Sequence, residues 1–307
     1  MEKERKRHSE VLIQFIVGRV GLTEISIPRI RIGKGKPVTT IITGIHGNET
    51  TGLLILQELL KAPPDIFGTL QLIMAANPLA LIERKRACFL DQVDMNRVFP
   101  GDPNGTITQR VAAKAREMLM SSDCVIDIHS FEMDTPLMGI MVNSSQNEKN
   151  EELLERFSPE QVWVILPEKR EEQQFGKSLS AILNELGIPN FALETTCAER
   201  ITSEEITAAA NGIKRIITNS PLCSKKRIPF FLRTKINTRE SGIFTPHINI
   251  FHKVKKGDVI GTITIFPEVK ELLIHAPVDG IVMQLMHRGF VLIGEEIAAL
   301  GTPWRKK

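Results

Sequence analysis

The sequence predicts an α/β protein with a mixed central sheet and helices on both faces, followed by a C-terminal all-β module of the barrel-sandwich type. Three observations support this fold class. β-branched runs alternate with helical patterns in the first part of the chain. Short extended runs separated by glycine and proline replace them after about residue 222. The 307 residues suffice for a main domain and a smaller one. We therefore predict two domains, 1–222 and 223–307.

The first domain begins with strands. Residues 1–10 form a charged leader, which we interpret as a solvated terminus because no small-residue cleavage site follows it. Residues 24–32 alternate imperfectly around a proline and predict an edge strand. The β-branched run 38–43, bounded by Pro37 and Gly44, predicts the first buried strand of the sheet.

Alternating periodicities predict the other elements of this domain. A long irregular segment, 77–105, interrupts them, and such segments inside compact domains are usually functional. The predicted helices are 53–60, 106–120, 151–157, 171–186 and 202–219, and the further predicted strands are 69–76, 123–128, 137–142, 161–166 and 190–194.

The C-terminal module contains a weak internal repeat. A Gly-Ile pair that begins at Gly242 precedes the turn at Gly257, and a second pair that begins at Gly280 precedes a similar turn at Gly294. Two similar hairpins related by a quasi-twofold axis would produce this echo. The repeat therefore predicts a β-sandwich.

Bulk composition excludes several classes of function. Apolar residues make up 42% and charged residues 24% of the chain, and a net charge of +3 gives no basis for a nucleic-acid partner. No apolar stretch approaches the roughly 20 residues that span a bilayer, so no membrane partner is expected. The four cysteines form no CxxC pair, which fits a reducing cytoplasm.

The stretch 43–52 carries the first chemical signal. His46 and Glu49 lie on a predicted strand-to-helix turn, at the carboxyl end of a strand, where ligands of open α/β sheets usually bind. Zinc accepts imidazole and carboxylate ligands, and a catalytic zinc site needs a third one. His129 is the best candidate, because it ends the apolar strand predicted at 123–128 and reaches the same sheet edge.

Each of these signals has a plainer alternative. An HxxE spacing occurs often by chance, and a turn histidine followed by a first-turn glutamate would explain it. Glu194 also ends an apolar strand, where it would suit a general base that moves a proton from water to a leaving group. The alternative is that Glu194 only caps its strand.

An ordered set of motifs resembles a known family. The chain contains, in order, Gly44-Ile45-His46-Gly47-Asn48-Glu49, Asn77-Pro78, Asp94-Met95-Asn96-Arg97-Val98-Phe99-Pro100-Gly101 and Asp127-Ile128-His129. This set looks like the succinylglutamate desuccinylase and aspartoacylase family, a branch of zinc hydrolases with a carboxypeptidase-like fold. The resemblance covers most of residues 38–200 and is much more specific than any single motif.

The resemblance implies a metal site and a base. It implies that His46, Glu49 and His129 bind a single zinc ion and that Glu194 activates the attacking water. These roles agree with the chemistry inferred from the residues alone.

The resemblance also implies roles for the long loop. Arg86 matches the arginine that polarises the scissile carbonyl, with Arg84 as a rival because the alignment is loose there. Asn96 and Arg97 match the pair that grips a substrate carboxylate, which a guanidinium fork can hold bidentately. For each arginine, the alternative is a solvated loop charge.

Departures from the family pattern leave the substrate open. The chain contains no tyrosine, so any tyrosine by which relatives contact substrate is absent. Glu132 and Asp134, just beyond the third ligand, could contact a cationic group of the substrate or could be ordinary exposed carboxylates. We therefore carry over neither aspartoacylase nor desuccinylase specificity.

The C-terminal module is similar to a biotinyl or lipoyl carrier domain around residues 276–282. A carrier would present a modifiable lysine at a hairpin, but Lys270 lacks the flanking Met-Lys-Met type of sequence. We interpret Lys270 as a solvated residue. The module then serves as a cap that narrows the cleft or supports contacts in a homo-oligomer.

These inferences converge on a cytoplasmic, zinc-dependent amidohydrolase that removes an acyl group from a small N-acyl amino-acid-like substrate. The nearest enzymatic alternative is a metallocarboxypeptidase acting on short peptides, since its fold and ligands would be alike. An alternative of another class is a non-catalytic small-molecule binding protein on the same scaffold. Zinc is the only cofactor expected, because hydrolysis needs no organic one.

Overall fold

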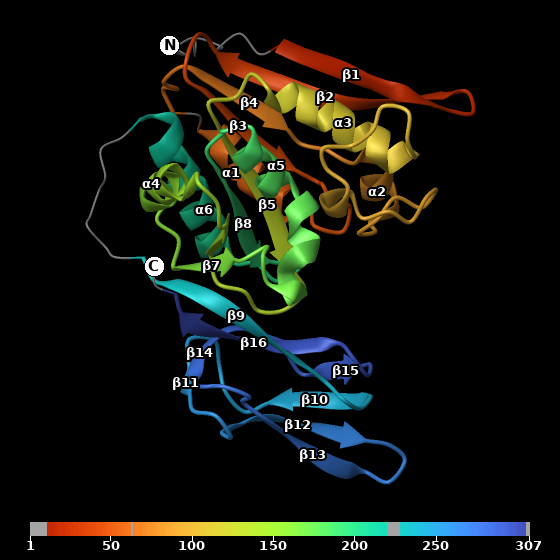
Figure 1. Cartoon of the computed structure of the whole chain (residues 1–307), viewed down its shortest axis with the longest axis vertical. Coiled ribbons are helices and arrows are strands. Elements are labelled where there is room, and N and C mark those ends of the chain that lie inside the picture. The colour runs from red at the N-terminus through yellow and green to blue at the C-terminus, as the bar shows by residue number, and fades with distance from the viewer. Residues whose placement is uncertain (1–10, 63, 220–227, 305–307) are drawn as a thin grey trace, which may run out of the picture.

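A mixed sheet of twelve strands runs through the molecule (Figure 1). The computed structural model describes residues 11–62, 64–219 and 228–304. In order across the sheet, the strands are β1 (Val11–Val20), β2 (Thr23–Gly33), β4 (Thr69–Ile73), β3 (Val38–Thr43), β5 (Cys124–Phe131), β8 (Asn190–Thr196), β6 (Met138–Val142), β7 (Gln161–Ile165), β9 (Phe230–Asn237), β16 (Glu296–Pro303), β14 (Gly280–Leu285) and β11 (Lys253–Val254).

Helices cover both faces of this sheet. Ile41 and Ile42 are adjacent in β3 but belong to different cores, one on each face. A strand that is buried on both faces reads as an unbroken apolar run, which is why 38–43 was recognisable. The mixed α/β architecture is therefore confirmed. One face carries α1 (Thr51–Lys61), α4 (Asn147–Phe157) and α6 (Ser203–Ile217), and the other carries α3 (Ile107–Leu119) and α5 (Leu179–Glu185).

The C-terminal part is built from strands alone between residues 228 and 304. A second, four-stranded sheet packs against its share of the large sheet around a separate apolar core. The strands of this second sheet are, in order, β13 (Lys270–His275), β12 (Val259–Ile265), β10 (Gly242–Pro246) and β15 (Gly289–Val291).

The internal repeat corresponds to equivalent strand pairs in the two sheets. β10 pairs antiparallel with β12 in one sheet, and β14 pairs antiparallel with β16 in the other. The short strand between the members of each pair joins the other sheet: β11 pairs with β14, and β15 pairs with β10. The repeat in the sequence thus marks two interlocked hairpins, as the quasi-twofold pattern predicted.

Two expectations about single elements were wrong. The strand predicted at 24–32 is not an edge, because β1 covers β2 with antiparallel pairing along its length. The predicted helix 171–186 is two elements, the 3-10 helix η2 (Arg170–Lys177) and α5. Ser178 separates them because its backbone is extended and its hydroxyl caps α5.

The segment 77–105 has local order that periodicity did not predict. It contains the short helix α2 (Pro78–Glu83), with Asn77 as its cap, and the 3-10 turn η1 (Met95–Arg97). η1 carries Asn96 and Arg97 to the site described below, and α2 packs against the turn that follows β3.

The large sheet continues across the predicted domain boundary at 222, since β9 pairs in parallel with β7. The boundary therefore stays a prediction. Among the described residues, the helices are too short or too polar to cross a membrane.

Candidate active site

The turn between β3 and α1 brings His46 and Glu49 to the carboxyl end of the sheet. Gly44 has a φ of +75°, a conformation that L side chains rarely adopt. At Gly47 a β-carbon would overlap the carbonyl group of Ala80 in α2, while the Gly47 amide donates to the Lys85 carbonyl at 2.9 Å. The glycines therefore let the turn pack directly on α2, which sets the direction of both side chains.

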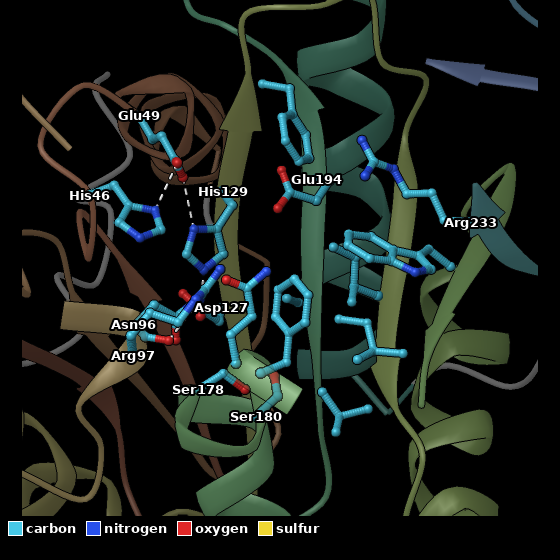
Figure 2. A pocket seen from close by; sticks show the side chains of 18 of the residues that line it. His46, Glu49, Asn96, Arg97, Asp127, His129, Ser178, Ser180, Glu194 and Arg233 are labelled. Carbon is cyan, nitrogen blue, oxygen red and sulfur yellow. Dashed lines mark hydrogen bonds and ion pairs between the residues drawn. The ribbon is translucent and has the colours of Figure 1, made fainter. Parts of the chain in front are cut away.

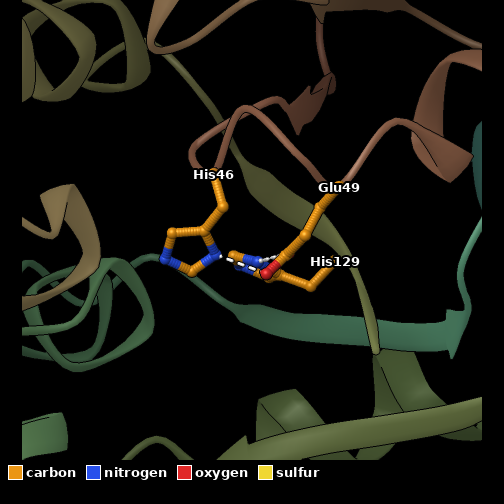
Figure 3. Close-up of side chains that lie close together, drawn as sticks. All are labelled: His46, Glu49 and His129. Atoms are coloured by element: carbon orange, nitrogen blue, oxygen red, sulfur yellow. Dashed lines mark hydrogen bonds and ion pairs between the residues drawn. The ribbon is translucent and has the colours of Figure 1, made fainter. Parts of the chain in front are cut away.

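His46, Glu49 and His129 converge in one buried cluster (Figure 3). One Glu49 oxygen lies 2.7 Å from His46 Nδ1, and the other lies 2.8 Å from His129 Nδ1. One ligand atom from each residue falls within 4.8 Å of the others. The structure thus brings together the three residues that the sequence proposed as metal ligands.

Two aspartates orient the imidazoles. His46 Nε2 lies 3.0 Å from Asp94 Oδ1, and His129 Nε2 lies 2.7 Å from Asp127 Oδ2. Each Nε2 can donate to its carboxylate, so that each Nδ1 presents a lone pair to the cluster. This is the carboxylate–histidine arrangement that fixes the tautomer of metal-binding imidazoles.

The donor set fits a zinc ion. Two neutral imidazole nitrogens and one carboxylate are a ligand set found in catalytic zinc sites. His46 Nδ1 is buried and, despite its short distance to Glu49, has no hydrogen-bond partner among the described residues. A cation held between Glu49 and the two Nδ1 atoms would satisfy this nitrogen.

Electrostatics within the cluster favour charged groups. Burial raises the pKa of Glu49, but His46 and His129 outweigh it and hold this pKa well below its usual range. Burial lowers the pKa of His129, while Asp127 and Glu49 raise it well above the ordinary value. The carboxylates therefore stabilise positive charge at the position where a metal cation would sit.

Glu194 lies beside the cluster on β8, where it is the register partner of His129 on β5. Its carboxylate is buried, and Oε2 has no hydrogen-bond partner among the described residues. Burial raises the pKa of Glu194 to about 8, with a further contribution from the negative charge of Glu49. A buried carboxyl group whose pKa lies near neutrality can act as both acid and base.

Glu194 and the cluster line a cavity of about 260 Å³ (Figure 2). Figure 2 shows Glu194 between the histidines and Arg233, which enters from β9. The guanidinium group of Arg233 lies over the Trp163 ring, 4.8 Å from its centroid, and pairs with Glu296. The C-terminal strands therefore contribute to the wall of this cavity.

The structure separates the two rival arginines. Arg86 lines the cavity and donates to Glu49 Oε1 at 3.1 Å and to Asp94. Arg84 lies instead in a second depression that also contains Arg200 and lies outside this cavity.

Asn96 and Arg97 both line the cavity. The Asn96 side-chain oxygen accepts a hydrogen bond from the Leu179 amide at 2.8 Å, which ties η1 to the start of α5. Arg97 lies over the Phe175 ring, 4.6 Å from its centroid, and donates to the Asn96 carbonyl. The two side chains thus reach the same space as the cluster.

Sequence reasoning did not assign roles to Asp127, Asp94, Phe175 and Arg233. Asp127 could have been found, because it lies two residues before His129 and side chains two apart in a strand share a face. Asp94 belongs to a quoted motif, but only the fold brings it to His46. Arg233 carries no local signal, since its place depends on the pairing of β9 with β7.

The fold and site define an α/β protein with a buried His-Glu-His cluster of metal-binding type beside a carboxyl group with a raised pKa. A family model for the succinylglutamate desuccinylase/aspartoacylase catalytic domain matches residues 36–219, more than half of the chain. The chain belongs to this family, as the ordered motifs predicted.

Solved structures agree on the fold over the whole chain. A succinylglutamate desuccinylase/aspartoacylase from Rhodobacter sphaeroides superimposes with a TM-score of 0.82 at 20% identity, covering 100% of this chain and 98% of that one. The product-bound ectoine utilization protein EutE (DoeB) from Ruegeria pomeroyi gives 0.81 at 19% identity, with coverage of 98% and 97%. At such identities the likeness concerns the fold.

A curated relative is similar over a shorter stretch. The N-alpha-acetyl-L-2,4-diaminobutyric acid deacetylase of Halomonas elongata is 34% identical over 111 residues, which are 34% of this chain and 32% of that protein. The match therefore spans about a third of the relative's length.

Proposed function

We propose that this chain is a zinc-dependent deacylase that hydrolyses the amide bond of a small N-acyl amino-acid-like substrate. The observation that carries the proposal is the convergence of His46, Glu49 and His129 beside buried Glu194. Membership of a family named for desuccinylation and aspartoacylation supports it, as does the similarity to a deacetylase.

His46, Glu49 and His129 would hold the zinc ion, with Asp94 and Asp127 orienting the two imidazoles. When bound, zinc supplies a Lewis acid that polarises the amide carbonyl and lowers the pKa of water. The burial of the cluster excludes competing water and strengthens these interactions.

Glu194 performs the proton transfers in this proposal. It accepts a proton from the attacking water and donates it to the departing amine nitrogen, so the carboxylate is regenerated after each turnover. A carboxyl group in an exposed position would be too weak a base for this task at neutral pH. The raised pKa of Glu194 meets the requirement.

Arg86 and Arg97 have separate roles in binding the substrate in this proposal. We assign the carbonyl oxygen to Arg86 rather than to Arg84, because Arg86 lines the cavity and Arg84 does not. Arg97 is held by stacking on Phe175 and by its own hydrogen bond to Asn96, so its guanidinium group is pre-organised for a substrate carboxylate.

The test is hydrolysis of N-acyl amino acids, including acetyl and succinyl forms of acidic and diamino compounds, by protein supplied with zinc. Release of the free amine should depend on zinc and should fall at least 100-fold in Glu194→Gln. Metal analysis of His46→Ala should show lost zinc. Full zinc occupancy in that variant, or equal activity in Glu194→Gln, would contradict the proposal.

The role of Arg97 has its own readout. Arg97→Ala should raise the KM of a carboxylate substrate at least tenfold, because a charge-assisted contact is lost. The KM of a substrate in which this carboxylate is replaced by a neutral carboxamide should change little in Arg97→Ala. An unchanged KM for the carboxylate substrate would remove Arg97 from this role.

A further inference from the structure

The side of the cavity that the sheet forms away from the histidine cluster is an apolar floor, while Gln174, Ser178 and Ser180 add polar lining from η2 and the start of α5. Side chains from three neighbouring strands and from η2 form this floor and belong to one buried cluster or pack against it. They are Ile140, Val142, Trp163, Ile165, Ala192 and Phe175.

Strand geometry makes this floor continuous with Glu194, the proposed general base. Ala192 lies two residues before Glu194 on β8 and therefore points to the same face of the sheet. Ile140 on β6 is the register partner of Ala192. Because neighbouring strands lie about 4.8 Å apart, the floor extends roughly 10 Å from β8 to β7. Hence a group attached near the scissile bond can lie along it.

Phe175 forms the edge of this floor that faces the proposed carboxylate grip at Arg97. Its ring carries Arg97 at 4.6 Å from the centroid and meets Trp163 edge-on, with the two ring centroids 5.6 Å apart. A substrate can therefore place a carboxylate on the Arg97 side of the ring and an apolar group on the Trp163 side.

Arg233, at the far end of the floor, is already held by partners within the chain. Its charge is paired with Glu296, and its Nε donates to Gln284 at 2.7 Å. The guanidinium group of Arg233 lies over the Trp163 ring while it contacts Glu296 and Gln284. Lys235, at the rim, also lies 3.6 Å from Glu296. With Arg233 held by these partners, the Trp163 ring beneath it is the surface at this end that an apolar chain can contact.

We propose that the substrate carries an unbranched aliphatic group of at least about four carbons, which lies along the floor from Ala192 toward Trp163. This inference rests on the proposed deacylase function and defines its substrate class. The aliphatic group is either the acyl chain or the side chain of the amino acid, because both lie next to the scissile amide.

The experiment uses two series of compounds on the full chain with zinc. One series is N-acyl-glycines from acetyl to octanoyl, and the other is N-acetyl derivatives of alanine, norvaline and norleucine. In one of the two series kcat/KM should rise about fourfold per methylene until the floor is filled. The series that shows this rise tells whether the aliphatic group is the acyl chain or the amino-acid side chain. Flat or falling values in both series would overturn the inference, as would succinyl-glycine or glutaryl-glycine exceeding the aliphatic compounds of equal length.

Binding measurements test the apolar floor independently of the proposed deacylase function. Calorimetry of the same compounds with the Glu194→Gln variant measures the apolar contacts without turnover. Affinity that rises with chain length supports the apolar floor even if the wild type hydrolyses nothing, in which case the deacylase function fails alone. Affinity independent of length contradicts the apolar floor even where acetyl or succinyl compounds are hydrolysed.

Two valines provide a matched pair of variants. Val142 on β6 lines the cavity, whereas Val164 on β7 is also buried but belongs to the core on the other face. Val142→Ala should move the preferred chain length up by about one carbon, and Val164→Ala should leave the length profile unchanged. A shift in both variants, or in neither, would contradict the assignment of the floor.

Discussion

Single residues decide the chemistry of the site through their neighbours. Asp127 contacts the His-Glu-His cluster through His129, and Asp94 contacts it through His46 and through Arg86, which also donates to Glu49. Glu194 owes its raised pKa mainly to burial. Two predictions belong to this scale.

The first concerns zinc affinity. In Asp127→Asn the charged partner of His129 Nε2 is lost, so the imidazole is a weaker and less fixed ligand. Zinc affinity, measured by competition with a chelator, should fall about 10-fold to 100-fold. Asp134→Asn is the control, because Asp134 pairs with Arg200 outside the cluster. Equal affinities in Asp127→Asn and wild type would show that this contact does not tune the site.

The second concerns pH. The pKa of Glu194 in the metal-free chain is about 8, above the ordinary value of 4.5, so the folded chain keeps a proton that the unfolded chain releases. This contribution to stability is complete below pH 4.5 and is lost as the pH rises to 8. Between these values, the melting temperature of metal-free Glu194→Gln should decline less with pH than that of wild type. Parallel curves would show that Glu194 titrates normally.

At the scale of elements, the turn from β3 to α1 is the part whose backbone matters most. Its helix partner α2 lies inside the segment that looked irregular in the sequence, and the turn packs on it through Gly47. The helix α2 within segment 77–105 therefore helps to position His46 and Glu49 in the cluster.

Gly47→Ala tests this packing. A methyl group at this position collides with the Ala80 backbone, which cannot move without displacing α2. We expect a loss of stability of about 1–3 kcal/mol in denaturant unfolding together with weaker zinc binding. Gly176→Ala is the control, because its added methyl group meets open space at a backbone angle that alanine tolerates. Normal zinc binding by Gly47→Ala would show that the turn adapts.

At the scale of the whole molecule, the C-terminal strands complete the part of the structure that holds the cavity. β9 extends the large sheet beyond β7, and Phe231 and Met283 fill the apolar cluster that also contains Trp163. Gln284 also donates to Thr135, in the segment after β5. The cap predicted from the sequence is therefore joined to the site by backbone pairing, apolar contacts and hydrogen bonds.

Removal of the module tests this dependence. The fragment 1–222 should lack a cooperative unfolding transition and deacylase activity, because β7 loses a neighbour and the Trp163 cluster is exposed to water. Supplying residues 223–307 as a separate chain should restore part of both. A fragment 1–222 that folds cooperatively and binds zinc would establish the predicted boundary as a true domain boundary.

The sequence alone predicts the fold class, most strands, the three residues that converge in the His-Glu-His cluster, and the position of Glu194 at the end of its strand. These features are local: strand and helix periods are written in neighbouring residues, and the motifs place their polar residues at strand ends. The broken helix at Ser178 and the buried position of β2 were not predictable, since a single cap and the pairing with β1 decide them.

The three-dimensional structure was needed to show that Arg86 rather than Arg84 reaches the cavity, and that Arg233 lies on the opposite side from the His-Glu-His cluster. Arg84 and Arg86 are two residues apart, and the left-handed backbone of Arg84 at the end of α2 separates their directions. Arg233 reaches the cavity because β9 pairs with β7. Strand pairing joins residues distant in the chain, and no local pattern records it. The substrate preference proposed here depends on that pairing.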